Sequence, residues 1–482
     1  MRKLEIYIIL ILIFISYIFN DIGNFSREPI LTILLSFLIM FYVVYKLWKL
    51  KKNDSKWFLQ PIAISSLSTI ILQYVFSNIL YTNDDFLRIM NTKVFITNSE
   101  AFHWINYTLV ITFGATVAMW YAYESNLSNR LSLKLTHLLK HFRFNANFKY
   151  KPFLIALLLL ASILSIYLQI SLGIFGWQKI AESEEFASIS GLLNLLQGLS
   201  LFSVLLISFS YFSGKTANRT ALIIVTILAM IIGLMHVSKG AFISPPLIVI
   251  LISLFYKVKI KLTKVGLISI FLVLIAYLII EPLRLAIGMD KLYNPKDINS
   301  LITNINYSLN YGDRTRVQET FYEASLSRQN MLLESAVAIR YKEVVGLGVN
   351  SPPFFNHLIF EPIYAFIPRL IWPSKPSMQE YGYWHQLVAH GYSHPVSRGM
   401  GPIGYLYMAG GTLLTILFFG IIGLFQKIIF KLFYSANAGK LLIYLVLLIN
   451  FIPIQTAVYA LSYDLIRDFI FVYIFQLIFF ES

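Results

Sequence analysis

The residues best suited to chemistry are cations that lie beside apolar stretches of the chain. Arg284 follows Glu281 by three residues at the end of one such stretch, and Arg369 lies within another. A cation in an apolar setting is costly unless a dedicated anion balances it. Guanidinium presents a planar fork of donors that grips phosphate through two bonds. We therefore expect these two arginines, supported by Arg398 and Lys375, to bind a phosphate or diphosphate.

The other cations have simpler alternatives. Lys239 lies in the tight turn 236–240, where its ammonium group can bind an anion or extend to lipid headgroups. The remaining arginines of residues 282–402 can pair with acidic residues of the same segment, Glu334 among them. We include Lys239 among the candidate phosphate-binding residues and regard the remaining arginines as ion-pair partners.

Three histidines, His385, His390 and His394, lie close together in the same segment. Gly391 and Pro395 argue against a regular helical pair of imidazoles. A zinc site would also need a further ligand and a supporting shell of hydrogen bonds. We therefore expect no metal, and a proton acceptor is the better assignment for one of these histidines.

Several catalytic motifs are absent or misleading. Residues 399–404 match the spacing GxGxxG, but dinucleotide binding needs a preceding strand within a βαβ unit, which this sequence lacks. No P-loop or serine-centred nucleophile elbow occurs, so ATP-driven transport and esterase chemistry have no support. The chain has no cysteine, which excludes a thiolate nucleophile and a disulfide framework. We expect no cofactor.

The elements that position these residues follow from composition. Of 482 residues, 57% are hydrophobic and only 13% are charged, whereas a soluble domain has about 25% charged residues. This excludes a soluble enzyme, a disordered protein and a nucleic-acid-binding domain. The net charge of +15 is typical of basic loops that face an anionic lipid leaflet. The chain is therefore expected to be an all-α polytopic membrane protein.

Runs of about 17–25 apolar residues identify membrane-spanning helices. Twelve such segments are expected, two of them short: Leu4–Ile22, Ile30–Trp48, Pro61–Tyr81, Trp104–Tyr123, Phe153–Leu172, Leu192–Ser213, Thr220–Val237, Phe242–Tyr256, Val265–Glu281, Ile403–Phe425, Leu441–Tyr459 and Ile466–Phe480. With the N-terminus inside, 22 of the 39 lysines and arginines fall in inner segments and six in short outer loops. This bias predicts cytoplasmic N- and C-termini.

One long outer segment separates nine helices in residues 1–281 from three in residues 403–482. Within it, apolar positions recur every three or four residues from Arg314 to Arg340, which predicts an amphipathic helix. Leu358–Trp372 is apolar but has two prolines, so an interfacial or re-entrant hairpin is expected there. A large apolar loop beside the membrane suits a substrate that is itself half lipid.

The stretch Pro368-Arg369-Leu370-Ile371-Trp372-Pro373-Ser374-Lys375-Pro376 resembles the loop signature of the bacterial oligosaccharide repeat-unit polymerases, the O-antigen polymerase (Wzy) family. Gly401-Pro402-Ile403-Gly404-Tyr405, followed by Gly410-Gly411, also resembles the pattern of that family, and so does Ser238-Lys239-Gly240. The remaining resemblance is architectural: many spans, one large outer loop and few charges within the membrane.

The resemblance implies a GT-C-like glycosyltransferase at the periplasmic face of the bacterial inner membrane. Donor and acceptor would be glycans linked to undecaprenyl diphosphate, within a lipid bilayer and without nucleic acid; a chain-length-determining co-polymerase is a further implied partner. Breaking the anomeric bond builds negative charge on the departing diphosphate, which preorganised cations would stabilise. The acceptor hydroxyl needs a proton acceptor, for which we choose His394, with Asp313 and Glu323 as alternatives.

Two other functions have similar sequence features. An O-antigen ligase would transfer the finished glycan, and sequence hardly separates it from a polymerase. A lipid-linked oligosaccharide flippase also has about a dozen spans, but transporters usually place polar groups at mid-membrane. Here charged residues are nearly absent from the centres of the expected spans, which favours chemistry at the surface. A polytopic acyltransferase is a weaker alternative.

Overall fold

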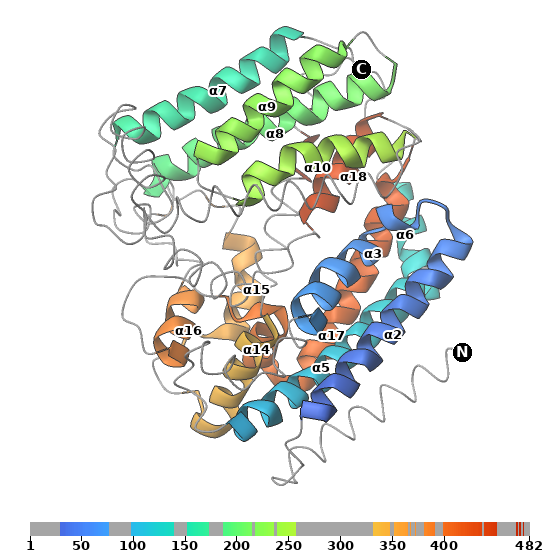
Figure 1. The fold of residues 1–482 in the computed structure, drawn as a ribbon, viewed down its shortest axis with the longest axis vertical. Coiled ribbons are helices and arrows are strands. Elements are labelled where there is room, and N and C mark those ends of the chain that lie inside the picture. Colours follow the sequence, from blue (N-terminus) through green and yellow to red (C-terminus); the bar gives the residue numbers. More distant parts are fainter. Residues whose placement is uncertain are drawn as a thin grey trace. The chain divides into compact units, whose positions relative to one another are not determined.

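The structure is a computed structural model, and it describes part of the chain. The described residues are 29–76, 98–138, 152–172, 187–214, 217–235, 239–256, 331–347, 351–364, 367, 372, 380–390, 399–435, 438–450, 469, 470, 472, 473 and 476. Within them every regular element is helical and no strand occurs, as the sequence predicts (Figure 1). The chain divides into two compact units, which are described in turn.

The first unit holds helices from both ends of the chain and from the long central segment. They are α2 (Pro29–Asn53), η1 (Trp57–Leu59), α3 (Pro61–Ser65), the π-helical η2 (Ser66–Val75), α5 (Asn98–Glu124), α6 (Asn126–Leu138), α14 (Met331–Arg340), η7 (Tyr341–Val345), α15 (Phe354–Tyr364), α16 (Glu380–His390), α17 (Gly401–Phe433) and α18 (Ala438–Asn450). The second unit holds α7 (Pro152–Ser171), α8 (Ala187–Phe212), α9 (Arg219–Met235) and α10 (Lys239–Phe255).

Several of these helices indicate a multi-pass membrane protein. Among the described residues, four helices are long and apolar enough to cross a bilayer: Leu31–Asn53, Glu100–Glu124, Pro152–Ser171 and Gly401–Phe433. Five shorter apolar helices coincide with further expected spans. The expected spans Leu4–Ile22 and Val265–Glu281 lie outside the described residues, as does most of Ile466–Phe480.

The helices of the first unit run in the relative directions that the sequence predicts. Thr32 donates to Asn106 at 2.7 Å and Lys46 donates to Glu124 at 2.9 Å, so α2 and α5 are parallel. Trp120 donates to Ser66 at 3.0 Å, and Tyr123 donates to Gln60 at 2.6 Å; α3 and η2 therefore run antiparallel to α5. The alternation expected for successive spans agrees with these contacts.

Helix α17 is broken near its N-terminus. Gly410 and Gly411 lie outside the helical region, and Gly411 has φ 73°. This left-handed conformation strains residues with a side chain, which explains the glycine. After the break, α17 continues beside α5 in the same direction, from Thr412 near Tyr107 to Gly423 against Met119.

The described part of the expected amphipathic helix Arg314–Arg340 is helical, but all ten residues of α14 are buried, so no exposed polar face occurs there. Helix α14 packs against both α5 and α17 and also contacts η2 (Figure 1). An apolar stripe and a helix buried on all sides share the same apolar positions, so the sequence pattern alone does not separate them. The residues of this range before Met331 lie outside the described part of the chain.

Helix α14 also lies deep in the unit. Its Ser335 contacts Tyr74, which follows Ser66 by eight residues on η2. Ser66 is level with Trp120, near the C-terminal end of α5. An α-helical residue rises about 1.5 Å and a π-helical residue rises less, so these eight residues cover at most about 12 Å and Tyr74 is level with the central turns of α5. The polar groups around Ser335 therefore lie beside the middle of an apolar helix.

The expected hairpin at Leu358–Trp372 begins as helix α15, which ends at Tyr364 before the second proline. One face of α15 is buried, at Phe354 and Leu358, whereas Phe355, Ile359 and Phe360 are 44–49% exposed. An exposed face made of aromatic and aliphatic side chains suits contact with lipid. Most of the remaining residues of the expected hairpin lie outside the described part.

The second unit is a bundle of helices that are neighbours in sequence. Ser162 of α7 donates to the carbonyl oxygen of Leu196 on α8 at 3.0 Å, an interhelical bond typical of membrane helices. Helix α9 ends at Met235 and α10 begins at Lys239, so Lys239 lies at a helix start; the rest of the expected turn lies outside the described residues. The side chain of Lys239 lies outside the description.

Candidate functional site

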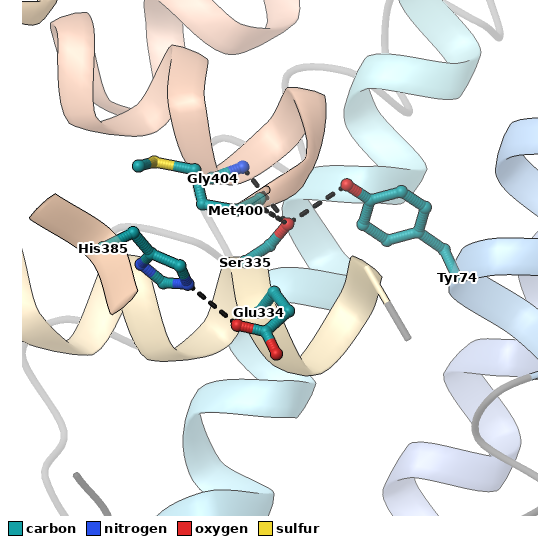
Figure 2. A network of polar contacts seen from close by, with 6 residues as sticks. All are labelled: Tyr74, Glu334, Ser335, His385, Met400 and Gly404. Atoms are coloured by element: carbon teal, nitrogen blue, oxygen red, sulfur yellow. Dashed lines mark hydrogen bonds and ion pairs between the residues drawn. The ribbon is translucent and has the colours of Figure 1, made fainter. Parts of the chain in front are cut away.

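The centre of the candidate site is a buried hydrogen-bonded pair of a carboxylate and a histidine, which joins two helices of the long segment. Glu334 of α14 and His385 of α16 approach to 2.8 Å between Oε2 and Nε2 (Figure 2). Their side chains are 2% and 1% exposed. A charged or strongly polar group buried to this extent is stable only with a hydrogen-bonded partner. The pair therefore fixes α16 against α14.

The next residue, Ser335, fixes the start of α17. Its hydroxyl donates to the carbonyl oxygen of Met400 at 2.9 Å and accepts from the backbone N–H of Gly404 at 3.2 Å (Figure 2). Tyr74 lies 3.1 Å from the same hydroxyl and accepts from the N–H of Ile403 at 3.4 Å. The first N–H groups of a helix lack partners within it, so Ser335 and Tyr74 complete the N-terminus of α17.

The close approach of α14 to α17 depends on a glycine. A Cβ atom on Gly404 would lie 2.9 Å from Cα of Ser335 and 3.3 Å from its Oγ. The nearest of these atoms is backbone and cannot rotate away. The glycine at this position is therefore required for the hydrogen bonds between the two helices.

These contacts bring both flanks of one candidate segment to the same place. Helix α16 ends at His390 and α17 begins at Gly401, and the expected site residues His394 and Arg398 lie between them. Two adjacent side chains of α14 contact the two flanks: Glu334 bonds to His385 of α16, and Ser335 bonds to Met400 at the start of α17. The segment 391–398 itself lies outside the described residues, but its attachments are fixed.

Aromatic rings complete the attachment of α15 and α16 to α17. Phe354 contacts Tyr381, Trp384 and Tyr405 at centroid distances of 5.1, 5.4 and 5.7 Å. The contacts with Trp384 and Tyr405 are edge-to-face, and such contacts add about 0.5–1.5 kcal/mol each beyond the burial of area. His357, also buried, contacts Tyr381 at 4.8 Å. These rings therefore pack α15 and α16 against each other and against the start of α17.

A second polar cluster lies at the C-terminal end of α14. Arg340 donates through Nε to Oε1 of Glu100, in the first turn of α5, at 2.8 Å. Two residues later, Lys342 donates to the carbonyl oxygen of Tyr407 at 2.7 Å and to that of Met408 at 3.3 Å. Tyr407 in turn donates to Glu343 at 2.9 Å. This cluster joins the end of α14 to the start of α5 and to the break in α17.

Lys342 compensates for the break in α17. The carbonyl groups before a helix break lose their regular N–H partners, and an ammonium group can replace them. Burial lowers the pKa of Lys342 below its ordinary value because it penalises the charged form, while the neighbouring Glu343 acts in the opposite direction. Lys342 thus stabilises the end of the first half of α17 at the expense of its own hydration.

Replacing Lys342 by methionine should lower stability by about 1–3 kcal/mol, because the carbonyl groups of Tyr407 and Met408 lose a charged donor. The measurement is the thermal midpoint of the detergent-solubilised full chain. Lys134→Met, at an exposed position of α6, is the matched control and should leave the midpoint unchanged. Equal midpoints for the two variants would mean that the Lys342 contacts add nothing.

Most of the site residues expected from sequence lie outside the described part of the chain. These are Arg284, Asp313, Glu323, Arg369, Lys375, His394 and Arg398. Their assignment stays a prediction, and so does that of Lys239, which lies at the first residue of α10.

Glu334 bonds to His385, and its expected pairing with an arginine of the long segment stays a prediction. One expectation about an ion pair needs correction. Arg340 was expected to pair within the same segment, but its partner Glu100 lies 240 residues earlier on α5. Sequence offered a weak signal for His385, as one of three clustered histidines, and none for Glu100.

The arrangement can bind and orient polar groups beside apolar helices. It contains a buried histidine–carboxylate pair, a nearly buried guanidinium and a desolvated ammonium group. Among the described residues, no group of three or more histidines and carboxylates is placed to hold a metal ion. No family model matches the chain, and neither a curated protein nor a solved structure matches it.

Proposed function

We propose that this protein polymerises undecaprenyl-diphosphate-linked oligosaccharide repeat units. The reaction is glycosyl transfer at the periplasmic face of the bacterial inner membrane and releases undecaprenyl diphosphate. The observation that carries the proposal is the position of α14, a helix with polar and charged side chains that is enclosed by apolar helices. Such a boundary between polar and apolar surroundings suits a substrate with a lipid half and a sugar half.

The proposed reaction needs cations at the leaving group. As the anomeric C–O bond breaks, negative charge grows on the diphosphate, and preorganised cations stabilise that charge most in the transition state. Arg284 and Arg369 take this role in the proposal, with Arg398, Lys375 and Lys239 in support. Their support is chemical: each lies beside an apolar stretch or in the segment that resembles the polymerase signature.

The acceptor hydroxyl must lose a proton to a base. His394 is the proposed base that accepts this proton, with Asp313 and Glu323 as alternatives. The contacts of His385 with Glu334 and of Met400 with Ser335 bring the two helices on either side of this segment to α14, which supports the choice of a base from it. In this proposal His385 is a positioning residue, because it is bonded to Glu334 and only 1% of its side chain is exposed.

Deletion of the gene tests this function directly. Loss of a polymerase should leave single repeat units on the carrier lipid at the outer face of the membrane. Loss of a ligase would instead leave long polymer on the carrier, and loss of a flippase would trap single units inside. The measurement is the size and sidedness of the lipid-linked glycans in the deletion strain, and either of the latter two results contradicts the proposal.

Exchanging Arg284 or Arg369 for alanine should abolish chain elongation at an unchanged protein level. The reason is that the departing diphosphate loses a charge-assisted bond that is strongest in the transition state. The readout is the polymer ladder on a gel, with the level measured by immunoblot. Arg130→Ala, at an exposed position of α6, is the control. Normal ladders from both alanine variants would refute this assignment.

A transporter of lipid-linked oligosaccharides is the second candidate. Two observations favour it: α17 is broken at Gly410–Gly411, and the buried Glu334–His385 pair lies near the level of the middle of α5. Transporters often bind substrates at broken helices and polar groups near mid-membrane. The deletion experiment separates this candidate from the polymerase by the side on which repeat units accumulate.

A further inference from the structure

Arg340 is buried but uses little of its capacity for hydrogen bonds. Its side chain is 10% exposed, and its Nε donates to Glu100 at 2.8 Å. Among the residues that the structure describes, its two terminal nitrogens make no hydrogen bond, and neither is a fully buried atom without a partner. Those nitrogens carry four of the five N–H donors of a guanidinium group. Because these donors are not enclosed, they are open to an acceptor from outside the chain.

The ion pair with Glu100 sets the direction in which the remaining donors point. Glu100 binds the guanidinium group along the edge that carries Nε. The two terminal nitrogens form a fork at the far end of the group and are then free to bind another ligand with two parallel N–H bonds. Two parallel N–H bonds from that fork match the spacing of two oxygens on a phosphate or carboxylate. Lys342, two residues further along, adds a second positive charge near the same end of α14. The unsatisfied side of Arg340 is therefore suited to an oxyanion.

The level of Arg340 in the unit indicates where that oxyanion comes from. Glu100 is the first residue of the apolar span Glu100–Glu124. The opposite end of this span has the Lys46–Glu124 ion pair, so the two polar ends bracket an apolar interior. The end of a membrane span lies near the headgroup region of the bilayer, where the phosphates of lipids are found.

We propose that Arg340 binds the phosphate or diphosphate group of a lipid-anchored ligand, end-on through its terminal nitrogens, with Glu100 as the residue that orients it. The choice of a polyprenyl diphosphate as that ligand rests on the proposed function. The same phosphate chemistry is also present in an anionic phospholipid headgroup. Competition from an anionic phospholipid separates the two sources. If the site is specific for the prenyl diphosphate, adding anionic lipid to the bilayer should not weaken its binding.

The test uses the purified full chain in nanodiscs of phosphatidylcholine, with farnesyl diphosphate as the probe and calorimetry as the readout. The wild type should bind the probe, and farnesol should not bind. Arg340→Gln should weaken binding by about tenfold or more, which corresponds to about 1.4 kcal/mol. Arg340→Lys should fall between the two, because it retains the charge but loses the fork. Arg130→Gln, which removes one exposed arginine from α6, should bind as the wild type does.

Thermal midpoints separate a lost ligand contact from a lost fold. Arg340→Lys should keep the midpoint of the wild type while its affinity falls. The same titrations are repeated in nanodiscs that contain phosphatidylglycerol. Two results together identify the phospholipid headgroup as the source: the wild type alone binds the probe more weakly, and the wild type but not Arg340→Gln retains phosphatidylglycerol. Unchanged probe affinity in both discs identifies the prenyl diphosphate. Equal affinities of the wild type and Arg340→Gln, or no binding by the wild type, overturn the proposal.

Failure of this proposal and failure of the proposed function are distinguishable. If Arg340 is needed for probe binding but the deletion strain accumulates no single repeat units outside, the phosphate site stands and the polymerase assignment fails. If single units do accumulate outside while Arg340→Gln binds the probe normally, the polymerase assignment stands and the Arg340 site fails.

Discussion

Replacing Gly423 by alanine should separate α17 from α5 and lower stability by about 3 kcal/mol or more. A Cβ atom at this position would overlap the carbonyl oxygen of Met119 and lie 2.9 Å from its carbonyl carbon and 3.1 Å from its Cα. All three are backbone atoms, so no side-chain rotation relieves the overlap. Overpacking a well-packed interior typically costs about 1–3 kcal/mol, and backbone overlap lies at or beyond the upper end of this range.

Gly420→Ala is a matched control for this prediction. It adds the same methyl group to the same helix about one turn earlier, where the nearest atom, the carbonyl oxygen of Ala118, would be 3.9 Å away. Alanine favours the helix over glycine by about 1 kcal/mol, so this variant should be neutral or slightly more stable. The thermal midpoints of both variants in detergent, by fluorescence-detected size exclusion, check the difference. If Gly423→Ala melts with or above Gly420→Ala, the close packing of α5 and α17 is wrong.

Removing one partner of the Glu334–His385 pair should cost about 3–5 kcal/mol, because the other partner is left buried without its hydrogen bond. We expect this from both Glu334→Leu and His385→Leu. The double variant should be more stable than the sum of the two effects predicts, since it leaves neither group behind. The free energies from a double-mutant cycle in detergent give the coupling directly.

His137→Leu is the control for this cycle, because His137 is exposed on α6 and its loss should leave stability nearly unchanged. Additive effects of Glu334→Leu and His385→Leu would show that the two side chains do not interact. Single-variant losses below about 1 kcal/mol would place the pair at a hydrated surface rather than in the interior.

The sequence by itself determined the helical class and the position of most described apolar helices. The segment Phe153–Leu172 predicts a span, and α7 is Pro152–Ser171; Ile30–Trp48 predicts another, and α2 is Pro29–Asn53. The reason is local: a long apolar run satisfies its own backbone hydrogen bonds only as a helix. The number and spacing of apolar residues therefore suffice for this level of structure, without knowledge of any neighbour.

Tertiary structure decided which polar side chains meet. Glu334 and His385 are 51 residues apart, and Arg340 and Glu100 are 240 apart, so no local pattern relates them. The burial of α14 is also a tertiary effect, since three neighbouring helices enclose it.

Tertiary structure also decides which glycines of a helix are needed for close packing. Nothing in the sequence separates Gly423, which contacts the backbone of Met119, from Gly420, which has room for a side chain. Local composition fixes where a helix forms, whereas the approach of a second helix fixes which of its atoms are buried, bonded or crowded.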